Sequence, residues 1–398
     1  MDLIGWAIFL VALLVSVMLH ETGHFVLAKK FGMKVTRYFV GFGPTIWSTW
    51  RGETEYGIKA LPFGGFVKII GMHSLDEVDD PDDEARAFRS HPAWQRILVL
   101  LAGSAMHFIL ALVLIFGLAL GVGIAYGNTT VGTLSPCVPV SLKAYDNGSC
   151  KGSHVTAPAK LAGLRLGDVV TAIDGHPVTN FTQLTDMVRP LPAGTPVTVT
   201  VRRDGKLVNL HAKLGHINGL GSYLGLSYAG YVFQIPSPLG AVEYAGTTFG
   251  QVLTGSAQAV ADLPGALPEL FNKNRSKTSA GQVSSVVGAA EITGTEVASD
   301  QGWQYKVSFV LLLIASLNIF FGAFNLLPLL PLDGGHIAAI IYERIRAWLA
   351  RLRGRPDPGL VDMAKLVPVS LSLFVIVIFF SVILVVADIV NPISISGG

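Results

Sequence analysis

Two histidines and a glutamate, spaced for one face of a helix, are the residues of this chain best suited to chemistry. His20, Glu21 and His24 spell HETGH. Helical residues four apart lie on one face and about 6 Å apart along the axis, so both imidazoles can reach one metal ion beside Glu21. Zinc suits this arrangement, because a catalytic zinc takes three protein ligands and a water whose pKa falls to about 7. Glu21 would accept a proton from that water and later protonate the leaving amine, as amide hydrolysis requires.

A third ligand has to come from elsewhere in the sequence, and the segment NLLPLLPLDGGH at 325–336 supplies it. Pro328 and Pro331 prevent a regular helix there, and broken backbone at membrane depth is tolerated only where it is buried in protein or lines a cavity. An acid in so apolar a stretch should therefore point inward. Zinc accepts oxygen or nitrogen, so chemistry alone permits either Asp333 or His336 as the ligand.

The elements that position these residues are membrane spans. The chain has 398 residues, of which 51% are hydrophobic and 14% charged, whereas a soluble domain usually has about 25% charged residues. Its net charge of +2 excludes a nucleic-acid partner recognised by basic charge. About 20 apolar residues suffice for one crossing. The apolar runs predict four spans, at 3–28, 97–125, 307–332 and 367–390.

The depth of HETGH strengthens the chemical interpretation. The motif directly continues the first apolar run, and Lys29 follows within about 14 Å of His20 along the helix. Two histidines and a glutamate at that depth are costly, and ionisable residues inside a span are functional candidates by default. A helix end whose polar residues merely reach the interface is the alternative.

Basic residues predict the orientation of the spans. Segments 26–95 and 336–365 hold nine and six Lys or Arg residues, so both should face the cytoplasm, while the long connection 126–306 can be translocated. Cys137 and Cys150 both fall in that connection and could pair in an oxidising compartment; two unpaired thiols are the alternative.

The translocated connection contains a small β-rich module. The segments 169–178 and 197–214 each place an Asp-Gly turn between alternating apolar residues, which predicts hairpins, and 181–189 has helical spacing. PAKLAGLRLGDVVTAIDG closely resembles the PDZ pattern. Such domains add an extended peptide to a sheet edge, although a spacer without a ligand is also consistent with these turns. Residues 237–274 predict either an amphipathic helix on the outer membrane face or a packing helix of the module.

Together these motifs resemble the site-2 proteases, the intramembrane zinc metalloproteases. HETGH, NLLPLLPLDGG and a PDZ insert between the second and third spans carry the resemblance, which covers almost the whole chain. The resemblance implies His20, His24 and Asp333 as the zinc ligands, and so favours Asp333 over His336. It also implies Glu21 as general base and Asn325 as a polar residue that stabilises the oxyanion.

Further features follow the family pattern, with one departure. The strand-like segment 46–71 resembles the family's membrane-associated β-hairpin, which is thought to pair with an unwound substrate; a purely structural cytoplasmic hairpin is the alternative. Related bacterial enzymes often have Ala-Gly-Pro-x-x-Asn in the second span, where this chain has Ala102-Gly103-Ser104-Ala105-Met106-His107. His107 could hydrogen-bond near the active site or approach the metal, but we expect a packed histidine with its hydrogen bonds satisfied.

We therefore expect a polytopic α-helical membrane protein with four transmembrane helices, an inserted β-rich PDZ-like domain and a membrane-associated β-hairpin. Its expected parts are 1–28 (first span with HETGH), 29–95 (cytoplasmic loop with the hairpin), 96–125 (second span), 126–235 (extracytoplasmic PDZ-like domain), 236–306 (extracytoplasmic amphipathic or linker segment), 307–335 (third span with the LDG motif), 336–365 (cytoplasmic basic helix or loop) and 366–390 (fourth span).

The expected activity is zinc-dependent hydrolysis of peptide bonds within transmembrane segments. The resemblance to bacterial members implies a multi-pass protein of the bacterial plasma membrane, with its active site near the cytoplasmic face. It also implies single-span substrates, anti-sigma factors among them, and an upstream first-cutting protease. A catalytically inactive membrane scaffold with a PDZ domain is the main alternative, against which the intact Glu21 argues. A transporter with a buried acid as its ion site does not explain two histidines spaced for one metal.

Overall fold

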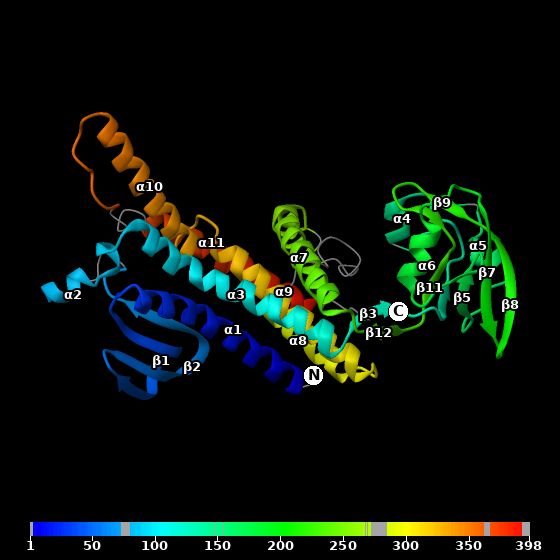
Figure 1. Ribbon diagram of the computed structural model, residues 1–398, viewed down its shortest axis with the longest axis horizontal. Helices are drawn as coiled ribbons and strands as arrows, with labels where there is room; N and C mark the ends of the chain where they lie inside the picture. Colours follow the sequence, from blue (N-terminus) through cyan, green and yellow to red (C-terminus); the bar gives the residue numbers. More distant parts are fainter. Residues whose placement is uncertain are drawn as a thin grey trace. The chain divides into compact units, whose positions relative to one another are not determined.

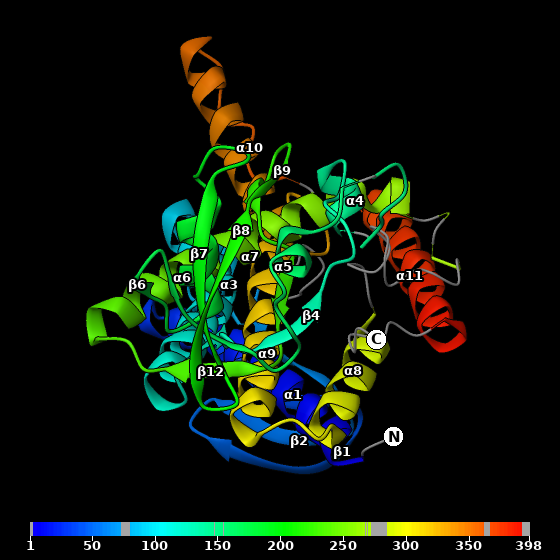
Figure 2. The ribbon, with the colours of Figure 1, turned by 90° about the vertical axis from the view of Figure 1, so that its right-hand side faces the viewer.

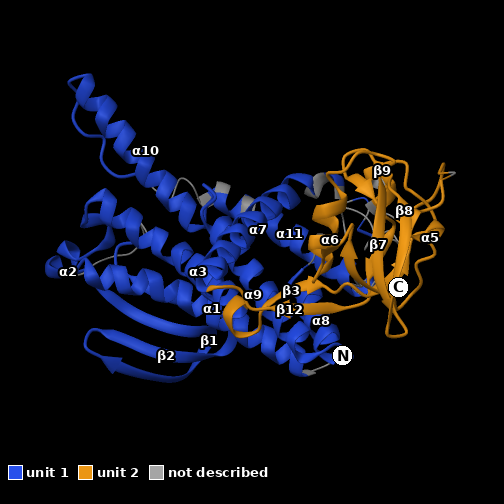
Figure 3. Cartoon of the chain, turned by 45° about the vertical axis from the view of Figure 1, so that its right-hand side comes forward, with its two compact units in different colours: residues 1–118, 238–398 blue, residues 119–237 orange. Residues whose placement is uncertain are grey.

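The computed structural model describes residues 3–72, 80–146, 148–153, 155–266, 268, 270–271, 285–361 and 367–391. The chain forms two compact units, one of residues 1–118 with 238–398 and the other of residues 119–237 (Figure 3). The HETGH and LDG motifs both belong to the first unit. The PDZ-like segment belongs to the second.

Four helices of the described residues are long and apolar enough to cross a membrane, as the sequence predicts. They are α1 (Leu3–Lys30), α3 (Ala93–Gly121), α9 (Trp303–Asn325) and α11 (Val367–Val390). Helices α1, α3 and α9 run side by side (Figure 1). Small and branched side chains let α3 and α9 pack closely, with Ala111 and Ile115 against Ala315 and Ile319.

Two of the spans end earlier than the apolar runs suggest. The second helix stops at Gly121, because Gly123 adopts a φ of +100° and residues Ile124–Gly127 form strand β3 of the other unit. The third helix stops at Asn325, before the two prolines. Asp333 is instead the first residue of a new helix, α10 (Asp333–Leu352).

The segment between the second unit and the third span is largely helical. Helix α7 (Pro238–Ala266) packs through Ala245 and Phe249 against the cluster shared by α3 and α9. Helix α8 (Val286–Ala298) packs on α1, where a Cβ on Gly5 would lie 2.6 Å from Gly294 Cα. Helix α8 also contacts α11, and the two lie close together in Figure 2.

The hairpin after α1 is longer than predicted. It consists of β1 (Val35–Arg51) and β2 (Thr54–Ile69), which lie beside α1 in Figure 1. Residues 37–40 pair with 65–68 on one side and with 55–58 on the other, while 45–51 pair with 54–59. Each strand is thus folded on itself. In β1 the bend needs Gly41, because its φ is +85° and a Cβ there would lie 2.6 Å from a backbone oxygen. The segment 65–69 is left as a sheet edge.

The connection to α3 contains two short helical segments, α2 (Pro81–Ala85) and η1 (Phe88–Ser90). The buried Phe88 packs with Met33, Val35 and Ile69, so this connection closes the end of the hairpin next to α1.

The second unit is β-rich with short helices. Its elements are β3, β4 (Val131–Leu134), α4 (Leu142–Asp146), α5 (Pro158–Leu161), β5 (Val169–Ile173), β6 (His176–Pro177), α6 (Phe181–Val188), β7 (Pro196–Arg203), β8 (Lys206–Lys213), β9 (Gly215–Ile217), β10 (Gly221–Tyr223), β11 (Leu226–Tyr228) and β12 (Tyr231–Gln234). The largest sheet has the order β6-β5-β7-β8, and α6 packs on its core through Leu184 and Val188. The predicted Asp204-Gly205 turn joins β7 to β8, with both residues at positive φ. Cys137 and Cys150 form a disulfide, so of the two alternatives that the sequence leaves open the structure shows the paired one.

Candidate metal centre and active site

Three side chains from two distant segments of the chain converge in the first unit. His20 and His24 lie one turn apart on α1, and Asp333 opens α10. His20 Nε2 lies 3.0 Å from His24 Nε2, and Asp333 Oδ2 lies 3.3 Å and 3.4 Å from these two atoms. Ligands of a tetrahedral zinc, at about 2.0–2.1 Å from the ion, are separated from one another by about 3.3–3.4 Å. Both the donor types and their spacing therefore fit zinc.

The hydrogen bonds of the imidazoles favour metal binding. His24 Nδ1 lies 2.8 Å from the carbonyl oxygen of Val99, which can only accept, so Nδ1 carries the proton and Nε2 keeps a lone pair facing the site. His20 Nδ1 is buried and has no hydrogen-bond partner among the residues that the structure describes. Two buried imidazoles and a carboxylate in contact with few other partners are an expensive arrangement without a cation.

The space for the imidazoles depends on a glycine in the facing helix. A Cβ on Gly103 of α3 would collide with the rings of both His20 and His24. A Cβ on Gly23 of α1 would likewise collide with the backbone of Ala102. Glycine at both positions thus allows α1 and α3 to approach closely at the level of the histidines.

A short non-helical segment between α9 and α10 presents Asp333. A Cβ on Gly334 or Gly335 would collide with backbone atoms of residues 326–330 in this segment. The two glycines of the LDGG sequence therefore let α10 start against the end of α9. His336, the other candidate ligand, lies on the next turn of α10 and is not among the three converging residues.

A cavity of about 630 Å³ opens beside these residues. Glu21 and Asn325 both line it, from α1 and from the last turn of α9. The other lining residues are mainly apolar and come from α1, β2, α3 and α9: Leu10, Val11, Leu13, Leu14, Val17, His20, Pro62, Gly64, His107 and Phe321. The cavity thus joins a carboxylate and an amide to a long apolar wall.

Comparison with known proteins decides the family. The sequence model of the family described as Peptidase family M50 matches residues 8–355 of this chain. The chain belongs to peptidase family M50. Because this is the site-2 protease family, the family predicted from HETGH and the LDG motif is confirmed.

Several named proteins are similar to this chain over most of its length. Zinc metalloprotease Rip1 of Mycobacterium tuberculosis is 38% identical, with 98% of each chain covered, and Rip1 of Mycolicibacterium smegmatis is 37% identical with the same coverage. Metalloprotease MmpA of Caulobacter vibrioides is 29% identical, over 86% of this chain and 88% of its own. A solved PDZ domain of an SdrC-like protein from Listeria monocytogenes is 21% identical over 24% of this chain and 90% of its own. Its TM-score of 0.17 is too low to carry an argument.

His107, where the second span departs from the expected Ala-Gly-Pro-x-x-Asn pattern, belongs to a buried hydrogen-bond chain. Its Nδ1 lies 2.8 Å from Asn318 Oδ1, and Asn318 Nδ2 donates to the Ile314 carbonyl at 2.8 Å and to Ser16 Oγ at 3.0 Å. Since the Asn318 amide nitrogen donates, its oxygen accepts, and His107 Nδ1 carries the proton. His107 is thus a packed, hydrogen-bonded residue, as expected, and it also lines the cavity with its ring 5.0 Å from that of His20.

The edge of the hairpin reaches the expected general base of this M50 peptidase. The backbone N–H of Val67, in the edge segment 65–69, donates to Glu21 Oε2 at 3.0 Å. The sequence predicted a hairpin and a base, but not this contact between them. No local pattern announces it, because it depends on how the hairpin docks on α1.

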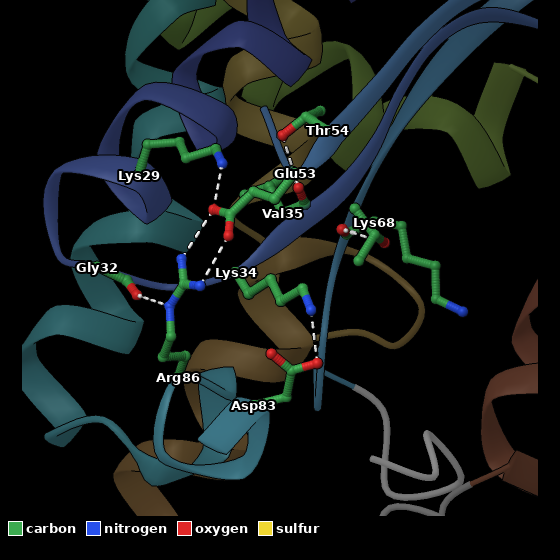
Figure 4. Close-up of polar contacts among 10 residues, drawn as sticks. Lys29, Gly32, Lys34, Val35, Glu53, Thr54, Lys68, Asp83 and Arg86 are labelled. Carbon is green, nitrogen blue, oxygen red and sulfur yellow. Dashed lines mark hydrogen bonds and ion pairs between the residues drawn. The ribbon is translucent and has the colours of Figure 1, made fainter. Parts of the chain in front are cut away.

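An ion-pair network fixes the hairpin to the end of α1 (Figure 4). Glu53, in the turn between β1 and β2, accepts from Lys29 at 2.5 Å and from two nitrogens of Arg86 at 2.7 Å each. Arg86 also donates to the Gly32 carbonyl. The Arg86 guanidinium, with Lys29, lowers the pKa of Glu53 to about 2, so this carboxylate is charged and paired at neutral pH.

Proposed function

We propose that this M50 peptidase is an intramembrane zinc metalloprotease in which His20, His24 and Asp333 hold the ion and Glu21 is the general base. One observation carries the proposal: two imidazoles and a carboxylate meet at ligand spacing beside Glu21, at the mouth of an apolar cavity. The zinc metalloprotease names of the full-length relatives support the same metal.

The residues divide the work of amide hydrolysis among them. When bound, zinc acts as a Lewis acid and brings the pKa of a water ligand to about 7. Glu21 takes the proton of the attacking water and passes it to the leaving nitrogen. Asn325 donates its amide N–H to the oxygen on which negative charge develops. The Val99 carbonyl holds the His24 ring in its ligating orientation.

The substrate is an unwound segment of a membrane-spanning protein. A helix hides its amides in its own hydrogen bonds, so cleavage requires local unwinding, and the exposed groups need partners in a place with little water. The edge segment 65–69 offers such partners next to Glu21. The apolar wall along Leu10, Leu14 and Val17 receives apolar side chains of the substrate.

The site faces the cytoplasmic side of a bacterial plasma membrane, and residues 119–237 form an extracytoplasmic PDZ-like domain. The Cys137–Cys150 disulfide supports this orientation, because disulfides persist outside the cytosol. The density of Lys and Arg in 26–95 and 336–365 supports it as well. The substrates are single-span proteins, anti-sigma factors among them, that a first protease shortens so that the PDZ-like domain admits them.

Co-expression with candidate single-span proteins whose N-termini are cytoplasmic tests the proposal. Wild type should cleave a substrate, while Glu21→Gln and His20→Ala should both accumulate in the membrane at normal level without cleaving it. Glu21→Gln should retain zinc, since Glu21 is not a ligand. Unchanged cleavage by Glu21→Gln would reject the mechanism.

A further inference from the structure

The outer half of α10 carries an exposed apolar stripe. Ile341, Ile345, Trp348 and Leu352 are spaced by about one helical turn and lie on one face, with 47%, 50%, 57% and 66% of their surface exposed. The opposite face of the helix is packed, with Ala347 buried. No described residue covers the stripe. So large an apolar face is unusual on a helix that continues away from the rest of its unit (Figures 1 and 2).

Contacts of the inner half fix where this stripe begins. Ile340 belongs to a buried cluster with Ala28 near the end of α1 and Val99 near the start of α3. Arg96 of α3 donates to Glu343 of α10 at 2.8 Å, and both side chains are buried. Residues 340–343 therefore lie level with the ends of two spans, where lipid headgroups begin, and the stripe starts at that level.

Arginines surround the stripe. Arg344 and Arg351 flank it on the helix, Arg353 and Arg355 follow at its end, and all four are exposed. No ion pair to a described residue involves any of them. The only acid in residues 344–361 is Asp357. Glu343 does not offset this charge, because it is already bound to Arg96 and to the Val361 N–H.

We propose that residues 341–355 form a binding surface for anionic phospholipid headgroups. An apolar helix face bordered by arginines enters the boundary between headgroups and acyl chains, and guanidinium groups bind phosphate through two parallel hydrogen bonds. The level at which the stripe starts favours a lipid over an acidic protein partner. Clusters of basic residues directly beyond a span are attracted to anionic lipids for the same reason.

The test measures lipid selectivity of the full-length protein in vesicles. Spin-labelled phosphatidylglycerol and spin-labelled phosphatidylcholine are compared by electron paramagnetic resonance in proteoliposomes of phosphatidylcholine, where motionally restricted label reports lipid bound to protein. Wild type should prefer phosphatidylglycerol, and added salt should weaken that preference. Since one basic residue near an anionic surface is worth about a fivefold change in binding, R344Q/R351Q/R353Q/R355Q should lose most of it.

Two matched variants make the result decisive. R344K/R351K/R353K/R355K keeps the charge and should keep most of the preference. K30Q/R51Q removes two exposed basic residues near the same end of the spans that do not border the stripe, and should reduce the preference less than the four substitutions at the stripe do. Equal selectivity in wild type and the glutamine variant would overturn the proposal and leave an acidic protein as the partner. The readout needs no proteolysis, so it is independent of whether a substrate is found.

Discussion

At the scale of single residues, the fit of the histidines against α3 depends on the absence of one side chain. Gly103 faces both rings, and any Cβ there would collide with them. We expect Gly103→Ala to displace the imidazoles or separate α1 from α3, and so to reduce bound zinc and cleavage by at least tenfold, the effect of about 1.4 kcal/mol. Zinc content after purification, measured beside the cleavage rate, checks this.

The matched control lies in the same helix. Gly117 has no atom within 4 Å of an added Cβ, so Gly117→Ala should leave zinc content and cleavage unchanged while it favours the helix. Normal zinc binding by Gly103→Ala would show that α1 and α3 can accommodate the added Cβ. The claim that Gly103 is needed to place the histidines would then be wrong.

The sequence predicted the site residues whose signal is local. HETGH is recognisable from the four-residue spacing of its histidines. Asp333 is recognisable because it is an acid in a segment of prolines and leucines. The role of Gly103 was not predictable, because a glycine in a helix has many uses and only the facing helix selects one. The bond between His107 and Asn318 joins residues 211 positions apart, and nothing in either segment signals the other.

At the scale of elements, α10 is held in register by a buried ion pair. Arg96 and Glu343 bind at 2.8 Å with both side chains about nine-tenths buried or more, and Asp333 opens the same helix. Arg96→Met should leave Glu343 buried without its cation, which typically costs about 3–5 kcal/mol. We expect a lower unfolding temperature and weaker zinc binding, measured by calorimetry and by competition with a chelator.

The double variant separates charge from position. R96M/E343M replaces the pair by apolar groups and should recover much of the stability, since apolar replacement of a buried pair is often neutral. If Arg96→Met alone kept wild-type zinc affinity and stability, α10 would be positioned by its other contacts.

The second unit carries an acid-sensitive ion pair. Asp168 is buried and accepts two hydrogen bonds from Arg203, at 2.8 Å and 2.7 Å, which lowers the pKa of the carboxyl group. A lowered pKa means that the pair stabilises the unit fully above the unfolded value of about 3.9, and that this contribution is lost as pH falls through the folded value. Amide exchange in β5 and β7, corrected for the intrinsic rate, should speed up on acidification below that range.

Substitution tests the source of this acid sensitivity. Asp168→Asn should cost about 2 kcal/mol at neutral pH and flatten the dependence on acid, whereas Asp186→Asn on the exposed side of α6 should do neither. A wild-type acid profile in Asp168→Asn would assign the sensitivity to another group.

Helices and strands were predictable from the sequence where their residues follow a regular apolar pattern or end in a recognisable turn. Hydropathy predicted four spans, and Asp-Gly turns predicted the hairpins of the second unit. The bounds were less secure, since the second apolar run continues into β3 after Gly123. The hairpin was predicted from residue 46 but begins at Val35. Residues 37–40 pair with segments on both sides, and this pairing depends on the fold of the hairpin rather than on a local sequence signal.

At the scale of the whole molecule, the metal centre joins parts of one unit that are far apart in the chain. His20 and His24 come from the first span, and Asp333 follows the third. All three belong to the unit of residues 1–118 and 238–398. The other unit has its own apolar core and its own disulfide, and contributes none of the three ligands.

Zinc removal should therefore loosen one unit only. A ligand that binds only the folded state stabilises it by about 2.7 kcal/mol at a hundred times its Kd, and chelation withdraws that contribution. We expect a chelator to speed amide exchange in α1, α9 and α10 and to leave exchange in β5, β7 and β8 unchanged. Adding zinc back should slow the exchange to its original rate and restore cleavage. His20→Ala should already exchange fast in these helices and respond little to the chelator. Equal loosening of both units in wild type would contradict the assignment, because it would mean that the ion acts outside the convergence of His20, His24 and Asp333.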